Sequence, residues 1–277
     1  MDAVDKKAFF LDLDGTLLND KKEVTPEDRA ALQSALDRGH KVVIASGRPP
    51  QSVAVQASRL GLDGPGCYWI ACNGAVVYDC GAGRELLHRS LAMEDLYALF
   101  DEARRRGVYI QTYGPEGVLV EASAPAAKET VERYCAGTLM HYDLISNVRR
   151  EVPTAPEKAL MIDFAGREKT EAMRQWIADN LSGRVDSYFS SAWYLEAVAA
   201  GVDKGNAVGE VCRILGLPIA SAIAAGDEAN DITMLRAAGT GFAMANAQPA
   251  VKEAADVVLD RDNNHGGVAE MIARVLG

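Results

Sequence analysis

The feature that most constrains the fold is a short apolar run near the N-terminus that ends in two carboxylates. Residues 8–11 are all apolar, and the sequence Asp-Leu-Asp-Gly-Thr follows directly at Asp12–Thr16. An apolar run of this length, bounded by a glycine, fits a strand buried on both faces of a parallel sheet. Asp12 and Asp14 then lie at the strand's carboxyl end, where open α/β sheets bind ligands. A solvated Asp-Gly turn would explain the same residues, but neighbouring acids repel each other unless a cation or proton intervenes.

Composition limits the classes of partner. The 277 residues are 48% hydrophobic and 25% charged, as in an ordinary globular protein of about two domains. Lys and Arg number 29 against 39 Asp and Glu, a net charge of −10. We therefore expect no nucleic-acid partner, because nucleic-acid binding needs a basic surface. A small anionic substrate remains compatible, since a metal ion and a few local cations can reverse the field in a cleft.

The cysteine and terminal patterns indicate the compartment. The five cysteines form no CxxC pair and the four histidines have no zinc-like spacing, so free thiols are expected. The first residues lack a signal-peptide core, and no apolar run approaches the ~18–20 residues that span a bilayer. We expect a cytoplasmic protein with no membrane partner. No feature of the sequence indicates an oligomeric state.

A helix and a second buried strand follow the first strand. Thr25 is a good N-cap for a helix that ends at Gly39, and residues 41–45 form the next apolar run. The order strand, helix, strand predicts a βαβ unit with parallel strands. The second strand ends at Ser46 and Gly47. These two residues could be a plain helix cap or a phosphate seat, because a glycine backbone can approach an anion closely.

Residues 68–78 read as a hairpin around an Asn73-Gly74 turn. Asn73 is explained by the turn alone, and only the family resemblance described below makes it also a candidate substrate contact.

Residues 83–190 follow a different pattern. Expected helices cover 93–106, 124–135 and 167–181, and expected strands cover 108–113, 117–121, 158–164, 185–189 and 193–198. No acid pair ends any of these strands. We expect an inserted α+β domain at 83–190, with residues 1–82 and 191–277 forming the first domain.

The chain returns to the first domain with two further polar clusters. Lys204 opens a helix, although the positive end of a helix disfavours a cation unless an anion lies nearby. The apolar run 221–225 ends at Gly226-Asp227, so Asp227 can converge with Asp12 and Asp14 on one cation. Asn230 could be an N-cap. Asp231 could pair with Lys204 or hold a metal-bound water.

These fragments resemble the four ordered motifs of the haloacid dehalogenase (HAD) superfamily of phosphohydrolases. The matching residues are DxDGT at Asp12–Thr16, Ser46, Lys204, and GDxxND at Gly226–Asp231. The inserted segment matches the position of the C2B cap in the Cof-like subfamily. The resemblance implies an α/β fold, with a Rossmann-like parallel-sheet core and an inserted α+β cap domain.

The resemblance also implies roles for the motif residues. Asp12 would be the nucleophile that forms an aspartyl-phosphate, and Asp14 the general acid and base. Mg²⁺ suits an oxygen-only ligand set, which would comprise Asp12, Asp227 and the backbone carbonyl of Asp14. The phosphoryl group would contact the side chains of Ser46, Lys204 and Asn230 and the backbone amides of Leu13 and Gly47.

The expected activity is hydrolysis of a small phosphorylated metabolite, such as a sugar phosphate, nucleotide or phosphorylated cofactor. A phosphomutase with the same nucleophile is the nearest alternative. A non-enzymatic phospho-aspartate regulatory module is another, but an insertion of about a hundred residues is hard to explain if no small molecule has to be enclosed.

Overall fold

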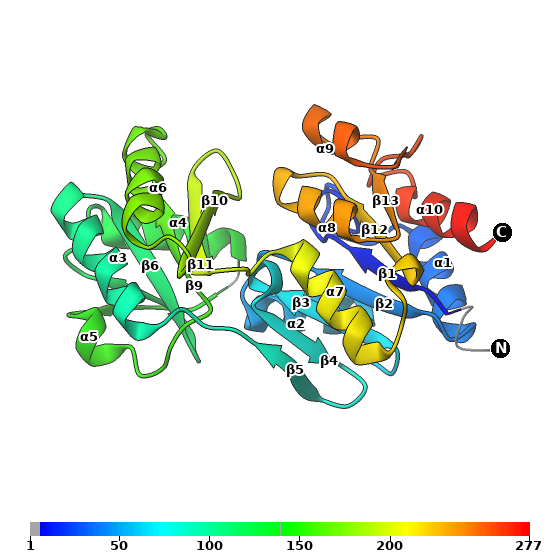
Figure 1. Ribbon diagram of the computed structural model, residues 1–277, viewed down its shortest axis with the longest axis horizontal. Helices are drawn as coiled ribbons and strands as arrows, with labels where there is room; N and C mark the ends of the chain where they lie inside the picture. The colour runs from blue at the N-terminus through cyan, green and yellow to red at the C-terminus, as the bar shows by residue number, and fades with distance from the viewer. Residues whose placement is uncertain (1–5, 139) are drawn as a thin grey trace. The chain divides into compact units, whose positions relative to one another are not determined.

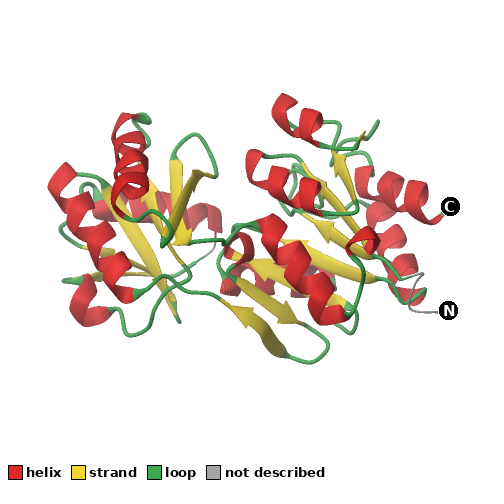
Figure 2. Ribbon diagram, viewed as in Figure 1, coloured by secondary structure: helices red, strands yellow, loops and turns green. Residues whose placement is uncertain are grey.

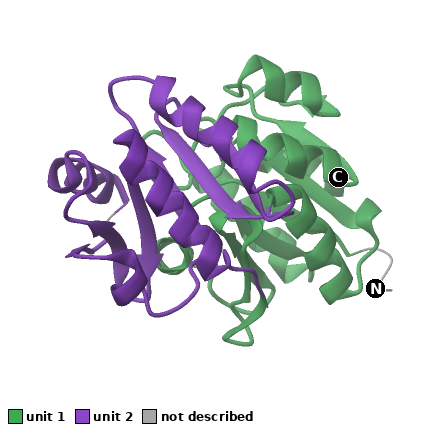
Figure 3. Ribbon diagram, turned by 60° about the vertical axis from the view of Figure 1, so that its left-hand side comes forward, with its two compact units in different colours: residues 1–87, 203–277 green, residues 88–202 purple. Residues whose placement is uncertain are grey.

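Two sheets organise the residues that the computed structural model describes, which are 6–138 and 140–277 (Figures 1 and 2). One sheet has the strand order β14-β13-β12-β1-β2-β3-β4-β5, and the other has the order β10-β11-β9-β6-β7-β8. The chain divides into two units (Figure 3). The first contains the described residues up to Leu87 and Asp203–Gly277, and the second contains His88–Val202.

The first unit is built on a parallel sheet. Its parallel strands are β1 (Ala8–Leu11), β2 (Lys41–Ala45), β3 (Cys67–Ala71), β12 (Ala222–Gly226), β13 (Thr240–Ala243) and β14 (Val257–Val258). Two further strands, β4 (Val76–Asp79) and β5 (Arg84–His88), extend one edge, and β4 pairs antiparallel with β3. Every residue of β1 is fully buried, as its apolar sequence predicts. The predicted α/β class with a parallel core sheet is confirmed.

Helices connect these strands or, in the case of the last one, follow them. They are α1 (Pro26–Asp37), α2 (Pro50–Leu60), α7 (Lys204–Leu215), α8 (Ile232–Ala237), α9 (Pro249–Ala254) and α10 (Gly267–Leu276), with short 3₁₀ turns η2 (Cys72–Gly74), η3 (Ile219–Ser221) and η4 (Ala229–Asp231). Thr25 caps α1 as predicted, because its side chain accepts a hydrogen bond from the Asp28 amide. α1 packs against α10, and α7 packs against α8.

The second unit is an α+β unit with apolar residues on both faces of its sheet. The strands are β6 (Tyr109–Gly114), β7 (Gly117–Glu121), β8 (Tyr142–Ile145), β9 (Lys158–Ile162), β10 (Val185–Phe189) and β11 (Tyr194–Ala199). The helices are α3 (Met93–Arg106), α4 (Ala127–Thr138), α5 (Val148–Glu151) and α6 (Glu168–Asn180). Ile110 packs with residues of α3 and α6, whereas its neighbour Tyr109 packs with residues of α4. This alternation along β6 places the helices on opposite faces.

The boundaries of the inserted unit differ from the predicted ones at both ends. β5 lies beside β4 in the first sheet, so the insertion begins at His88 rather than at residue 83. β11 pairs with β9 and β10, so the insertion ends at Val202 rather than at residue 190. A strand's own residues do not reveal its pairing partner, which is why the sequence misplaced both.

No helix among the described residues is both long and apolar enough to cross a membrane.

Candidate active site

The carboxyl ends of three neighbouring strands bring the predicted residues together. β1 pairs with β2 on one side and with β12 on the other, all in parallel. Asp12, Ser46 and Asp227 each follow the last residue of one of these strands, so they lie at the same edge of the sheet. The Asp12 amide still donates to the Ala225 carbonyl at 3.1 Å, which fixes the start of the turn after β1.

Three buried carboxylates form the centre of the site. One oxygen from each of Asp12, Asp227 and Asp231 lies within 4.8 Å of the others. The three residues are 7%, 7% and 0% exposed, respectively. Acids this close repel one another strongly where water is excluded, so the cluster needs positive charge to remain ionised. Oxygen ligands of this kind suit a hard divalent cation.

Lys204 supplies part of that charge. It is fully buried, and its Nζ donates to Oδ1 of Asp12 at 2.5 Å and to Oδ1 of Asp231 at 2.6 Å. Asp203 caps α7 immediately before it, because its side chain accepts from the amides of Gly205 and Asn206. Lys204 is therefore a cation in a first helical turn that is compensated by two acids. One ammonium against three carboxylates leaves the ionised cluster two negative charges in excess, which matches a divalent cation.

The close packing of α7 against α8 depends on a glycine next to Lys204. A Cβ on Gly205 would lie 2.4 Å from the Thr233 carbonyl oxygen. A side chain there would push the first turn of α7 away from α8, and Lys204 with it.

Burial and the neighbouring charges shift the pKa values of Asp12, Asp227 and Lys204. Burial raises the pKa of Asp12 well above its ordinary value, against the attraction of Lys204. Burial also raises the pKa of Asp227 to about 7, with a contribution from the charge of Asp231. Burial disfavours the charged form of Lys204, but Asp12 and Asp231 outweigh it and raise the pKa of this ammonium above its usual value. The surroundings therefore favour the charged form of Lys204, and the raised pKa values of Asp12 and Asp227 favour their protonated forms.

Gly15 and Thr16 contact Asp227 directly, which the sequence did not predict. The Thr16 hydroxyl donates to Oδ1 of Asp227 at 2.7 Å. Gly15 has φ of +88°, and a Cβ there would lie 2.3 Å from Oδ2 of Asp227. Gly15 thus permits both the turn after β1 and the close approach of Asp227, and the Thr16 hydroxyl orients the Asp227 carboxylate.

The Asp231 carboxylate accepts hydrogen bonds from the turn after β12 in addition to the one from Lys204. Its Oδ2 accepts hydrogen bonds from the amides of Asp227 and Glu228, each at 3.0 Å. Gly226 leaves room for it, because a Cβ there would lie 2.4 Å from the Asp231 Cβ. One carboxylate therefore links the start of α7 to the Asp227 turn.

The Asp14 side chain is not part of the carboxylate cluster; it forms ion pairs with two basic side chains. Nε and Nη2 of Arg48 donate to its two oxygens at 2.8 and 2.9 Å, and Nζ of Lys22 donates to Oδ1 at 2.8 Å. Burial opposes ionisation, but these cations outweigh it and lower the pKa of Asp14. The sequence did not assign a role to Arg48 or Lys22. The only signal was that Arg48 directly follows Ser46 and Gly47.

The residues predicted to bind a phosphoryl group lie beside one another at the same edge. Ser46 is buried, and its Oγ accepts from the Arg48 amide at 3.2 Å. A Cβ on Gly47 would lie 3.0 Å from Nδ2 of Asn73. The side-chain Nδ2 of Asn230 donates to Oδ1 of Asn73 at 3.0 Å. Leu13, whose amide was predicted to contact the phosphoryl group, lies in the turn between Asp12 and Asp14 and has a buried side chain.

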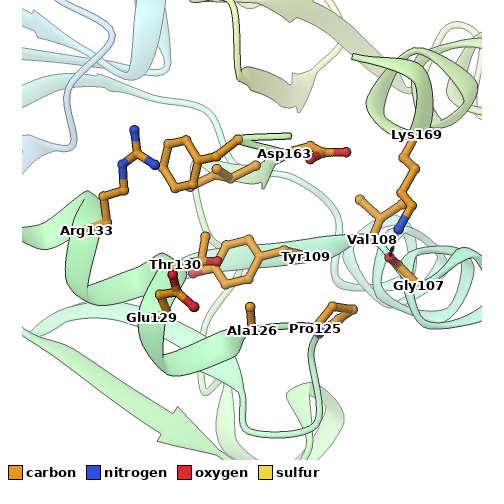
Figure 4. Close-up of a pocket in the computed structure, with 12 residues that line it drawn as sticks. Gly107, Val108, Tyr109, Pro125, Ala126, Glu129, Thr130, Arg133, Asp163 and Lys169 are labelled. Carbon is orange, nitrogen blue, oxygen red and sulfur yellow. Dashed lines mark hydrogen bonds between the residues drawn. The ribbon is translucent and has the colours of Figure 1, made fainter. Parts of the chain in front are cut away.

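A separate cavity of about 250 Å³ lies within the second unit (Figure 4). Tyr109, Arg133 and Lys169 are among its lining residues. The guanidinium of Arg133 stacks on the Phe164 ring at 3.7 Å from its centroid, and Nζ of Lys169 donates to the Gly107 carbonyl at 3.4 Å. None of the predicted site residues lines this cavity.

The chain is similar in sequence and in structure to known proteins. A family model described as haloacid dehalogenase-like hydrolase matches residues 9–272. The Bacillus subtilis (strain 168) protein YxeH is 32% identical over 96% of this chain and 97% of its own length. The 5-amino-6-(5-phospho-D-ribitylamino)uracil phosphatase YcsE of the same organism is 29% identical over 97% of this chain and 95% of its own.

A crystal structure of a haloacid dehalogenase-like hydrolase from Bacteroides thetaiotaomicron has a TM-score of 0.87 to this chain. It is 29% identical, and the match covers 98% of this chain and 100% of that one.

Proposed function

Because the chain belongs to the haloacid dehalogenase-like hydrolase family, we propose that it is a phosphatase of small phosphorylated metabolites. The observation that carries this proposal is the buried cluster of Asp12, Asp227 and Asp231 with Lys204 against it. Such a cluster is costly in a protein that does not use it, since buried charges destabilise unless they are matched. It suits a reaction in which an anionic group and a cation are held together.

Asp12 and Asp227 would hold Mg²⁺ through their carboxylates, and Asp14 through its backbone carbonyl. The excess of two negative charges in the cluster supports this fit, as does the exclusively oxygen donor set. When bound, the ion would neutralise charge on the phosphoryl oxygens, which is a main requirement of phosphoryl transfer.

Asp12 would act as the nucleophile. One of its carboxylate oxygens forms a bond to phosphorus while the bond from phosphorus to the ester oxygen breaks. Asp14 gives a proton to the departing oxygen. Water then attacks phosphorus, Asp14 takes the water's proton, and Asp12 leaves as a carboxylate. The ion pairs of Asp14 with Arg48 and Lys22 favour its charged form, which the second step needs. The first step needs the protonated form, so it would proceed against these two ion pairs.

The remaining residues would bind and orient the transferring group. Its oxygens would accept hydrogen bonds from the side chains of Ser46, Lys204 and Asn230 and from the backbone amides of Leu13 and Gly47. Preorganised donors of this kind each contribute about 10²–10³ in rate in other enzymes. Asp231 would keep Lys204 charged and in place, since its carboxylate is the ammonium's second partner.

The second unit would serve as a C2B-type cap and select the substrate. The similarity to YcsE, which is named for a phosphorylated ribitylaminouracil, supports a phosphorylated metabolite of that size range.

A panel of phosphorylated sugars, nucleotides and cofactors assayed with Mg²⁺ tests the proposal. We expect release of inorganic phosphate from at least one of them, and its loss in Asp12→Asn. Isomerisation of a sugar phosphate without phosphate release would identify a mutase. A stable phosphorylated protein without turnover would identify a regulatory module.

A further inference from the structure

The Asn73 turn has an unusual backbone. Cys72 and Asn73, between β3 and β4, have φ of +48° and +55°. This left-handed region is uncommon for residues other than glycine, although asparagine tolerates it better than most. The amides of both residues donate to the loop after β2, that of Cys72 to the Arg48 carbonyl at 2.9 Å and that of Asn73 to the Ser46 carbonyl at 3.0 Å. The turn is therefore fixed against the loop that carries Ser46 and Gly47.

The Asn73 side chain has one satisfied and one unsatisfied end. It is 1% exposed, and its Oδ1 accepts the hydrogen bond from Asn230. Its Nδ2 is buried and has no hydrogen-bond partner among the described residues. An unpaired buried N–H group costs about 1–3 kcal/mol, so native proteins rarely keep one without a reason.

The position of Asn73 Nδ2 indicates which kind of acceptor it would bind. Asn73 contacts Asn230, and its Nδ2 is the nearest atom, at 3.0 Å, to the position that a Cβ on Gly47 would take. Both residues are among those proposed to bind the phosphoryl group. A turn-forming role alone would require only the backbone, which glycine would adopt with less strain. An anion bordered by Gly47 and Asn230 would supply the acceptor that Nδ2 lacks.

We propose that Asn73 is a phosphoryl-binding residue: its Nδ2 donates to a non-bridging oxygen of the transferring group while its Oδ1 orients Asn230. This inference rests on the proposed function. It differs from a contact with the leaving group, because the phosphoryl oxygens are common to every substrate and the leaving group is not.

Two substitutions distinguish the role of the Asn73 side chain from the role of its backbone. Asn73→Gly keeps the left-handed backbone and removes the carboxamide, whereas Asn73→Asp keeps the acceptor and replaces the donor with a negative oxygen. Cys72→Gly is the matched control, because it relaxes the neighbouring left-handed residue and leaves Asn73 in place. Thermal unfolding of each variant, followed by circular dichroism, verifies that it is folded at the assay temperature.

With the purified full chain and Mg²⁺, we expect Asn73→Gly to lower kcat/KM by about 10²-fold, as for loss of one preorganised donor. The factor should be the same for p-nitrophenyl phosphate and for an alkyl phosphate, and inhibition by orthovanadate should weaken by a similar factor. Asn73→Asp should be at least as impaired, and Cys72→Gly should stay within a few-fold of wild type.

Losses that differ widely between the two substrates, or unchanged vanadate inhibition, would overturn the inference. If the wild-type protein hydrolyses no phosphate ester, the proposed function fails, and calorimetric titration with orthovanadate then decides about Asn73. Binding that weakens in Asn73→Gly would still support a phosphoryl site, whereas no binding, or binding independent of Asn73, would exclude it.

Discussion

Nζ of Lys204 lies 2.5 Å from Oδ1 of Asp12, although 192 positions separate the two residues in the chain. The contact exists because α7 begins at Lys204 and packs against α8, which follows the strand next to β1. The ammonium is fully buried and bridges Asp12 to Asp231. The proposed nucleophile and the lysine that would bind the phosphoryl group are thus in direct contact.

Removal of the Lys204 charge should destabilise the metal-free protein. Lys204→Met leaves two buried acids without their cation, which typically costs about 3–5 kcal/mol. Urea unfolding in the presence of a chelator measures this loss. Lys22→Met is the matched control, because Lys22 is largely exposed and its ion pair with Asp14 should contribute only about 0–1 kcal/mol. Equal stabilities of the two variants would contradict the assigned role of the buried lysine.

Stabilisation by Mg²⁺ should increase with pH. The pKa of Asp227 is about 7 in the folded chain against an ordinary value of 3.8. Between these two pH values the folded state keeps a proton on Asp227 that the unfolded state has lost. Stability from this group is therefore lost as the pH rises from 3.8 to about 7. An ion bound to ionised Asp227 removes that penalty. The rise in Tm caused by Mg²⁺ should be larger at about pH 8 than at about pH 5.5.

Asp227→Asn is the control for the pH experiment, because the amide has nearly the same shape and does not titrate. The variant should show little Mg²⁺-induced rise in Tm at either pH. A wild-type rise in Tm that is independent of pH would argue against Asp227 as a metal ligand.

Asp14→Asn should impair substrates according to their leaving groups. An alkoxide needs a proton as it departs, whereas p-nitrophenolate departs readily without one. The fall in kcat/KM, which reports the first irreversible step, should therefore be larger for an alkyl phosphate than for p-nitrophenyl phosphate. Steady-state kinetics with both esters measure the difference. Equal losses for the two esters would remove Asp14 from the proton-transfer role.

A second buried ion pair gives a test of stability apart from the active site. Nζ of Lys158 in β9 lies 2.7 Å from Oε2 of Glu196 in β11, and both side chains are almost completely buried. Lys158→Met alone should cost about 3–5 kcal/mol, because it leaves the buried carboxylate without its cation. The double variant Lys158→Met/Glu196→Met should recover most of this loss in urea unfolding. A double variant less stable than the single one would show that the charge of Glu196 is needed for another reason.

The sequence predicted that Asp12, Asp227 and Lys204 would meet because each of them lies at one end of an element whose pattern is local. Asp12 and Asp227 end apolar runs, and Lys204 opens a helix against the preference of the helix dipole. The pairing of β1 with β12 then brings Asp12 and Asp227 together, and the packing of α7 against α8 brings Lys204 to them.

The ion pairs of Asp14 could not be predicted in the same way. Arg48 reaches Asp14 from the loop after another strand, and Lys22 reaches it from a residue with φ of +62°. Such contacts depend on side-chain reach and on turn geometry that no periodic pattern records. The burial of the Asn73 side chain and its contact with Asn230 are of the same kind, since an Asn-Gly pair predicts a turn with a left-handed asparagine but not what its side chain contacts.

The most direct test of the account is to find where the phosphoryl group is attached during turnover. Asp14→Asn should slow hydrolysis of the intermediate, so acid quenching of this variant with substrate and Mg²⁺ should trap a phosphorylated chain. Borohydride reduction converts an aspartyl-phosphate into homoserine, which mass spectrometry locates in the sequence. Homoserine should be found at position 12, and none should be found when Asp12→Asn is added. Phosphorylation of Ser46, or turnover with no modification of Asp12, would contradict it.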